Sequence, residues 1–213
     1  MTIFKDRTEA GGKLAEVLGE FKDTNAVVLA LPRGGVAVGA EVAHALGLPL
    51  DIIVTRKIGA PGNEEYAIGA IDIEGNGVWN EVEKAQVDKA WLEKKVAEEK
   101  TEAERRWKEY RGTRGQLDLA GKTAVIIDDG IATGMTMQAA VRYAKKLGAK
   151  RVVVAVPVAP PSSLEVIKQE AEVHALKAPG LFFAVGQFYE DFPQVSDKEV
   201  IALLSPKPES RFT

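Results

Sequence analysis

Four short apolar runs recur along the chain, each bounded by charge, glycine or proline. Their β-branched residues favour strands, which we predict at residues 26–31, 50–55, 123–127 and 151–158. Apolar residues recur at helical spacing over 36–46 and 136–147, and Gly47 and Gly148 stand where such helices would end. Strands that alternate with helices imply right-handed crossovers and a parallel sheet covered on both faces. The pattern therefore predicts an α/β fold.

Residues 81–111 do not follow this alternation. They include nine acidic and nine basic residues but no glycine or proline. One face of a helix can hold their apolar residues Leu92, Val96, Ala103, Trp107 and Tyr110. We predict a helical insertion, broken near Asp88, within a single domain 1–213. A lid or a dimerisation arm is one interpretation, and a homodimer stays open. Balanced charge is more typical of a solvated helix packed through one apolar stripe, which we favour.

Composition narrows the classes of function. Hydrophobic residues make up 46% of the 213 residues and charged residues 28%, as in ordinary globular proteins. The net charge of -3 offers no overall field for nucleic acid or an anionic membrane, so neither is an expected partner. Cysteine is absent, which excludes disulfides and thiolate metal sites. His44 and His174 alone are too few for a histidine-rich metal site or a Ser–His relay.

Targeting and membrane signals are weak. Charged residues crowd the first ten positions with no apolar region behind them, unlike a signal peptide. The longest uncharged stretches, such as residues 152–164, reach only 13 residues with three prolines. A membrane-spanning helix needs about 20 apolar residues. We expect a cytoplasmic protein.

The segment 123–137, TAVIIDDGIATGMTM, carries the strongest chemical signal. A buried-type strand ends in Asp128 and Asp129, and the loop Thr133-Gly134-Met135-Thr136 opens a helix. Free amides and the positive dipole end at a helix N-terminus suit a phosphate, which two nearby carboxylates would repel. A ribose between them resolves this conflict, because its vicinal hydroxyls donate to the carboxylates. The alternative, that the aspartates only cap the helix, places them too far from its first turn.

This segment resembles the phosphoribosyl pyrophosphate (PRPP) signature of the type I phosphoribosyltransferases, through the run DDGIATGMT. The resemblance implies that family's parallel-sheet fold with a small hood, and it covers nearly the whole chain outside 81–111. It also implies PRPP as a substrate. The ribose and 5′-phosphate would be bound by Asp128, Asp129, Gly130, Ala132, Thr133, Gly134, Met135 and Thr136.

Upstream, Leu31-Pro32-Arg33-Gly34-Gly35 follows the first predicted strand, as the pyrophosphate-binding loop does in that family. Gly34 and Gly35 permit close approach of the backbone to an anion, and Arg33 adds a fork of donors. The resemblance implies a non-prolyl cis peptide between Pro32 and Arg33. Taken alone, this motif is equally consistent with a plain strand-to-helix turn.

Arg56 and Lys57 end the second predicted strand, ahead of a loop at residues 59–66 that contains Pro and Gly. Adenine phosphoribosyltransferases carry a similar Arg-Lys, loop and Glu-Tyr. The resemblance implies a loop that closes over the active site, with Arg56 and Lys57 neutralising pyrophosphate. Glu64 or Glu65 would approach the leaving or attacking group, and Glu65 is our catalytic candidate. A mobile hairpin with ordinary surface charges is the alternative.

Residues 181–192, LFFAVGQFYEDF, gather aromatic side chains beside two acids. In several family members a C-terminal hood stacks the base on an aromatic ring, and a nearby acid reaches the metal through water. The resemblance makes Phe188 and Tyr189 candidates for stacking and Asp191 a candidate for the metal. Core packing is the more common role of such a run.

Together these features predict a phosphoribosyltransferase. It would move ribose 5-phosphate from PRPP to a nitrogenous base with release of pyrophosphate, and Mg²⁺ would bridge the pyrophosphate and the ribose. In 6-oxopurine enzymes an additional Asp helps protonate the purine, and here Ala132 stands at that place. This disfavours hypoxanthine, guanine and xanthine and leaves adenine, orotate, uracil or another acceptor open.

Two other classes of protein share the predicted site for ribose and phosphate. A regulator would bind PRPP without turnover, and a PRPP synthetase would also need an ATP site. The loops around Arg33 and Arg56-Lys57 favour the transferase.

Overall fold

A computed structural model of the chain describes residues 4–205. Its centre is a five-stranded parallel sheet in the order β2-β1-β6-β7-β8. The strands are β1 (Ala26–Ala30), β2 (Leu50–Ile52), β6 (Thr123–Ile127), β7 (Arg151–Val158) and β8 (Glu172–Lys177). β1 is buried along its whole length, as expected for a strand with helices on both sides. The predicted α/β class is confirmed.

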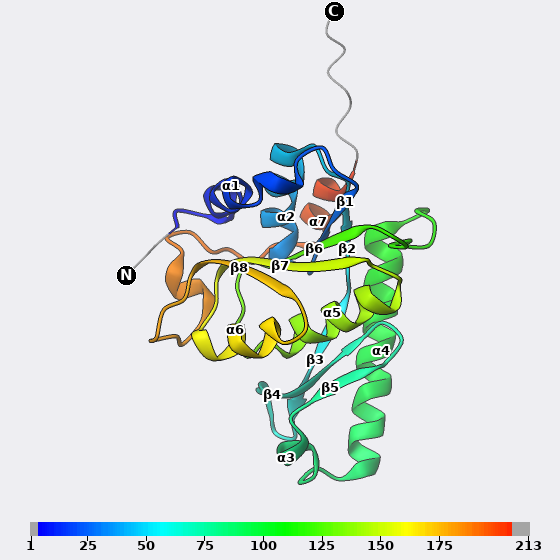
Figure 1. Cartoon of the computed structure of the whole chain (residues 1–213). Helices are drawn as coiled ribbons and strands as arrows, with labels where there is room; N and C mark the ends of the chain where they lie inside the picture. Colours follow the sequence, from blue (N-terminus) through cyan, green and yellow to red (C-terminus); the bar gives the residue numbers. More distant parts are fainter. Residues whose placement is uncertain (1–3, 206–213) are drawn as a thin grey trace, which may run out of the picture.

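Helices cover the two faces of this sheet (Figure 1). They are α1 (Arg7–Val17), α2 (Gly34–Leu46), α5 (Met135–Lys146), α6 (Pro161–Lys168) and α7 (Asp197–Leu204), with short 3-10 turns η1 (Gly19–Phe21) and η2 (Val185–Phe188). Alternate strand residues point to opposite faces. Val28 therefore packs in the core beneath α1 and α2. Leu29, its neighbour in β1, packs in the core with α5 and α6.

The predicted strands and helices of the parallel sheet are present, with one difference. The second strand ends at Ile52, earlier than expected, so Arg56 and Lys57 lie inside the next strand, β3 (Thr55–Ala60). Gly47 ends α2 in the left-handed conformation, with φ 65°. In residues 4–205 the structure has no helix long and apolar enough to cross a membrane.

A second, antiparallel sheet departs from the sequence-based expectation. It consists of β3, β4 (Asn63–Asp72) and β5 (Gly77–Trp79) in that order. Residues 59–66, expected as a loop, form the end of the β3–β4 hairpin, and its turn passes through Gly62 at φ 76°. Helix α5 packs on this sheet, where Ala139 meets Ala70 and Val78.

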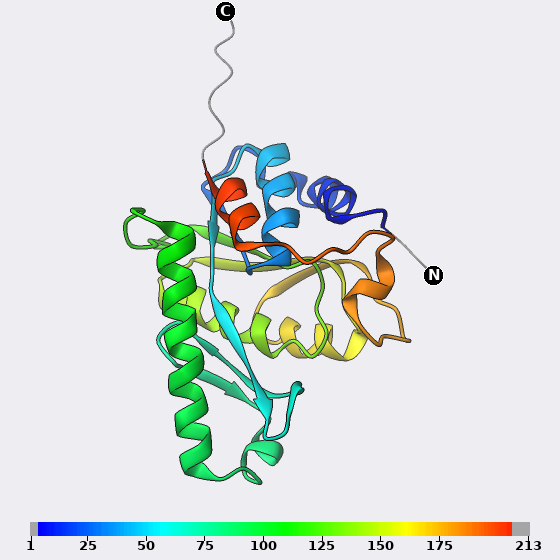
Figure 2. The ribbon, with the colours of Figure 1, turned by 180° about the vertical axis from the view of Figure 1, so that it is seen from behind.

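The insertion forms α3 (Glu81–Lys84) and α4 (Lys89–Arg111), with the break at Asp88. The Asp88 carboxylate caps α4 by accepting a hydrogen bond from the Trp91 N–H at 2.8 Å. The predicted apolar stripe is present and packs along its whole length. Leu92 and Val96 contact the second sheet, whereas Ala103 and Tyr110 lie in a core shared with α2, α7 and the β2 edge. Figure 2 shows α4 running beside both sheets.

Candidate functional site

The two aspartates of the signature lie where β6 ends, at the carboxyl edge of the parallel sheet. Asp128 Oδ1 accepts a hydrogen bond from the Asp129 N–H at 2.8 Å, and Asp129 Oδ2 lies 2.8 Å from Arg7 Nε. Burial raises the pKa of Asp128 well above its ordinary value, and the negative charge of Asp129 adds to this shift. Burial also raises the pKa of Asp129, with Arg7 opposing the shift. When both carboxyl groups are ionised, the pair can accept hydrogen bonds from hydroxyl groups.

The loop between β6 and α5 is pinned on two sides. The Ile131 N–H donates to the Val158 carbonyl at 2.9 Å, and the buried Ser163 hydroxyl, from α6, donates to the Ala132 carbonyl at 2.5 Å. Gly134, the N-cap of α5, has a φ of 84°, a conformation that favours glycine. The loop therefore holds the amides of the first turn of α5 at a fixed place, as a phosphate site requires. No sequence pattern had pointed to Ser163 as a residue that supports this loop.

The predicted pyrophosphate loop lies directly against the two aspartates. A Cβ built on Gly34 would lie 1.9 Å from Asp129 Oδ2, and one built on Gly35 would lie 2.8 Å from the Asp128 Cα. Only glycine fits this approach. The Pro32–Arg33 peptide is cis, as the resemblance implied. Two segments far apart in sequence thus meet at the carboxyl end of β6.

Arg7 is a site residue that the sequence analysis missed. It is the first residue of α1 and only 8% exposed. Besides Asp129, its guanidinium donates from Nη1 to the Pro193 carbonyl at 2.8 Å and lies 3.8 Å from the centroid of the Phe192 ring. One signal was available: Arg7 is on the buried stripe of α1, a place where an unpaired charge is costly.

Comparisons with known proteins identify the family of the chain. Residues 5–177 match the family model described as the phosphoribosyl transferase domain. The chain belongs to this phosphoribosyl transferase family. It is 44% identical over 207 residues to a Mycobacterium tuberculosis protein named "Putative phosphoribosyl transferase Rv0571c", covering 96% of this chain and 47% of that protein. The chain thus spans about half the length of the curated relatives it matches.

A solved structure matches the chain over nearly the full length of both proteins. The crystal structure of TT1426 from Thermus thermophilus superposes with a TM-score of 0.80 at 44% identity. The match covers 95% of this chain and 98% of that one. This solved structure therefore shares the fold of the chain, including the parts beyond the PRPP signature.

The cations expected to be catalytic, Arg56 and Lys57, are paired with carboxylates. Arg56 Nε lies 2.8 Å from Glu99 Oε2 of α4, and Lys57 Nζ lies 2.9 Å from Glu65 Oε2. Lys95 of α4 joins the same network, 3.0 Å from Glu99. These residues surround a cavity of about 220 Å³. The structure thus brings Arg56, Lys57 and Glu65 together, and it adds two residues from the insertion that the sequence did not connect with them.

The hood segment, residues 181–193, corrects the expectation for base stacking. Phe188 and Tyr189 are 4% and 5% exposed, because this segment lies against Phe4 and turns both rings into a core cluster. Neither ring offers a face to a base in this arrangement. The Tyr189 hydroxyl instead donates to the Asp129 carbonyl at 2.6 Å. Phe183 is the hood aromatic that is exposed, at 88%.

Tyr189 serves as a neutral donor. Burial raises its pKa far above the ordinary value, with a further contribution from the charge of Asp129. Asp191, the metal candidate, is exposed on the same segment, and its N–H donates to the Lys5 carbonyl at 2.9 Å. The hood therefore fastens the N-terminus and the backbone of Asp129 together.

The acidic cluster best arranged to hold an ion, among residues 4–205, lies elsewhere. Glu20, Glu172 and His174 come close together near the start of β8, whereas Asp128 follows the end of β6. The strands are parallel, so these are opposite edges of the sheet. Arg151 pairs with Glu172 at 2.6 Å and with Glu20 at 3.4 Å. Its guanidinium therefore already supplies the positive charge that a metal ion would bring to these carboxylates.

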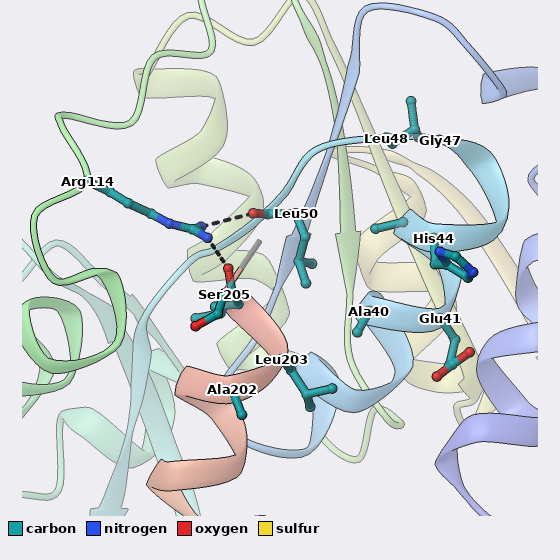
Figure 3. A pocket seen from close by; sticks show the side chains of 12 residues that line it. Ala40, Glu41, His44, Gly47, Leu48, Leu50, Arg114, Ala202, Leu203 and Ser205 are labelled. Atoms are coloured by element: carbon teal, nitrogen blue, oxygen red, sulfur yellow. Dashed lines mark hydrogen bonds between the residues drawn. The ribbon is translucent and has the colours of Figure 1, made fainter. Parts of the chain in front are cut away.

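A larger cavity, of about 410 Å³, lies between the C-terminal ends of α2 and α7 (Figure 3). Arg114 reaches across it and donates to the carbonyls of Leu50 and Leu204. Leu50 starts β2, so this cavity is at the amino edge of the sheet. It is separate from the site at Asp128 and Asp129.

Proposed function

We propose that this chain transfers ribose 5-phosphate from PRPP to a nitrogenous base and releases pyrophosphate. The approach of Gly34 to Asp129 and of Gly35 to Asp128 supports this most directly. An anion on the Arg33-Gly34-Gly35 loop and a phosphate on the α5 loop would lie on either side of one carboxylate pair. PRPP has this order of groups: pyrophosphate, diol-bearing ring and 5′-phosphate.

In this proposal, Asp128 and Asp129 accept hydrogen bonds from the vicinal hydroxyls of the ribose. The amides from Ala132 to Thr136 bind the 5′-phosphate, and the pyrophosphate leaves toward Arg33. Positive charge develops at C1 of the sugar as that bond breaks, next to two carboxylates fixed by the fold. Positioning and electrostatic stabilisation would thus supply most of the rate.

Mg²⁺ suits the donors around the site, because it prefers oxygen ligands and keeps several waters. When bound, it would neutralise the charge of the departing pyrophosphate. Asp191 stays the candidate for a contact through water. Most ligands of the ion would come from the substrate.

The acceptor is proposed only by exclusion. Ala132 is exposed in the loop where the 6-oxopurine enzymes carry an Asp, and the Ser163 hydroxyl fixes its carbonyl. With no carboxyl group at that position to protonate a 6-oxopurine, hypoxanthine, guanine and xanthine are disfavoured. Adenine, orotate, uracil or a less common base stay open.

The test is incubation with PRPP, Mg²⁺ and a panel of bases, followed by measurement of released pyrophosphate. We expect release with at least one base and its loss in the double variant Asp128→Asn/Asp129→Asn. Asp23→Asn, a surface change before β1, is the matched control and should keep full activity. Binding of PRPP without release with any base would favour the regulatory alternative. Equal PRPP affinity of the double variant and the wild type would overturn the ribose assignment.

A further inference from the structure

We propose that Arg7 is a positioning residue for ribose recognition: it holds the Asp129 carboxylate in the orientation that accepts the sugar diol, and it locks the hood against that carboxylate. This inference rests on the proposed function. It assigns a role to a residue outside the PRPP signature and outside both other loops.

Two hydrogen bonds and one aromatic ring hold the guanidinium of Arg7. Nε donates to Asp129 Oδ2 and Nη1 donates to the Pro193 carbonyl, each at 2.8 Å. The side chains of Arg7 and Asp129 are only 10% and 13% exposed. The Phe192 ring stacks against the guanidinium at 3.8 Å. An arginine fork held at several points has little freedom left, so it fixes the orientation of its partner.

The hood also holds the backbone of Asp129. The Tyr189 hydroxyl donates to the Asp129 carbonyl, while the hood amides of Glu190 and Asp191 donate to the carbonyls of Phe4 and Lys5, each at 2.9 Å. The backbone and the side chain of Asp129 are thus both tied to one assembly of N-terminus and hood. That amount of support is more than a surface carboxylate needs and fits a group that must be pre-oriented for a ligand.

The pair also borders the pyrophosphate loop. A Cβ at Gly34 would lie 3.2 Å from Arg7 Nε as well as 1.9 Å from the Asp129 carboxylate. Without Arg7, a largely buried carboxylate would be left without its cation. It would then favour the protonated form and accept hydroxyl donors less well. The expected consequence is selective loss of binding to the sugar.

Isothermal titration with two probes tests this inference. Ribose 5-phosphate carries the diol, whereas inorganic pyrophosphate fits the anion loops without a diol. Arg7→Gln should weaken ribose 5-phosphate about 10- to 100-fold, the range for a hydrogen bond to a charged group, and change pyrophosphate affinity less than about twofold. Arg7→Lys restores the charge without the fork and should fall between Arg7→Gln and wild type.

The matched control is Lys13→Gln, which removes an exposed cation of α1 that forms an ion pair with Glu9 and lies 5.6 Å from the centroid of the Phe4 ring. It should leave both affinities unchanged. Pyrophosphate binding also reports whether each variant is folded. If Arg7→Gln fails to fold, the comparison of Arg7→Lys with wild type decides the inference, and wild-type affinity of Arg7→Lys for ribose 5-phosphate would overturn it.

A double-variant cycle separates positioning from general support. If Arg7 acts through Asp129, Arg7→Gln should cost nothing further once Asp129→Asn is present. Equal losses of affinity for both probes, or additive losses in the cycle, would show that Arg7 only supports the fold and would overturn the inference. If the wild type itself binds neither PRPP nor ribose 5-phosphate, the proposed function fails, and the inference with it. Retained sugar binding in Arg7→Gln defeats the inference alone.

Discussion

Two adjacent glycines determine how closely the loops of the site approach. Gly34 and Gly35 have ordinary helical surroundings at the start of α2, yet each faces an aspartate of the β6 end with no room for a side chain. Glycine is required at both positions because the backbone lies so close to the aspartates, and not because of an unusual φ. Because the clash at Gly34 is with the carboxylate itself, a methyl group there would displace either the loop or Asp129.

Gly34→Ala should therefore weaken PRPP binding by about tenfold or more, since a shift of about 1 Å suffices to lose such contacts. The control is Gly12→Ala, at an exposed position of α1 with no atom within 4 Å of the new Cβ. It should leave binding unchanged and stabilise the fold by about 0.5–1 kcal/mol, as alanine does in a helix. Calorimetric titration with thermal unfolding measures both effects. Full PRPP affinity in Gly34→Ala would contradict the packing argument.

The raised pKa of Asp128 predicts how PRPP affinity depends on pH. A raised pKa means that the carboxyl group takes up its proton at a higher pH than an ordinary Asp, near 3.8. The protonated form accepts hydroxyl donors poorly, so affinity should fall as pH decreases, beginning above the usual range for Asp. Titrations between pH 8 and pH 5 measure this. The variant Asp128→Asn should lack that part of the pH dependence, and an unchanged profile in it would assign the effect to another group.

At the scale of elements, the insertion and the hairpin depend on one another. Glu99 of α4 lies between Arg56 of β3 and Lys95 of its own helix and is only 12% exposed. Partial burial acts to raise the pKa of Glu99, but hydrogen bonds from Lys95 and Arg56 outweigh it and keep the pKa below its ordinary value. The insertion is thus part of the support of the predicted catalytic arginine.

Glu99→Gln should lower the free energy of unfolding by about 1–3 kcal/mol, because two partly buried cations lose their shared carboxylate. Chemical denaturation measures the change, and Glu98→Gln, at the neighbouring exposed position, should cost less than about 0.5 kcal/mol. Since the pKa of Glu99 is lowered by folding, its contribution is present above the unfolded value of 4.5 and is lost as pH falls through the folded value. The difference between Glu99→Gln and wild type should therefore shrink in acid. A difference that persists there would point to packing.

At the scale of the whole molecule, helix α4 joins the two sheets. Its last residue, Arg111, makes a two-pronged pair with Asp51 of β2, with both N–O distances at 2.8 Å. The same guanidinium donates to the Gly115 carbonyl and lies 4.2 Å from the centroid of the Trp107 ring. With Arg111 only 6% exposed, this junction fixes the second sheet and its cation cluster relative to the parallel sheet.

Asp51→Asn should destabilise the protein by about 3 kcal/mol, because it leaves a buried guanidinium without its counter-charge. Glu170→Gln is the matched control: it removes the partner of the more exposed Arg142 and should cost less than about 1 kcal/mol. Urea unfolding followed by two probes, one in each sheet, measures the loss and its cooperativity. A loss below about 1 kcal/mol in Asp51→Asn would show that the junction contributes little.

The sequence by itself determined the parallel sheet, the break at Asp88 and the PRPP loop, because each depends on the residues of one continuous stretch of chain. Apolar periodicity sets which face of a strand or helix is buried, and DDGIATGMT sets a local strand–loop–helix geometry. At residues 59–66 a hairpin was only the alternative to a loop that closes over the site, because Pro61 and Gly62 give strong loop signals that compete with the strand pairing.

Tertiary structure alone decided the partners of the site. Arg7 and Asp129 are 122 positions apart, and no local pattern connects them. Phe188 and Tyr189 had the composition of a stacking surface, but the hood packs against Phe4 and buries both rings. Local spacing determines which chemical groups a segment can offer, whereas only the packing of distant segments determines which of them remain accessible to a ligand and which charges they meet.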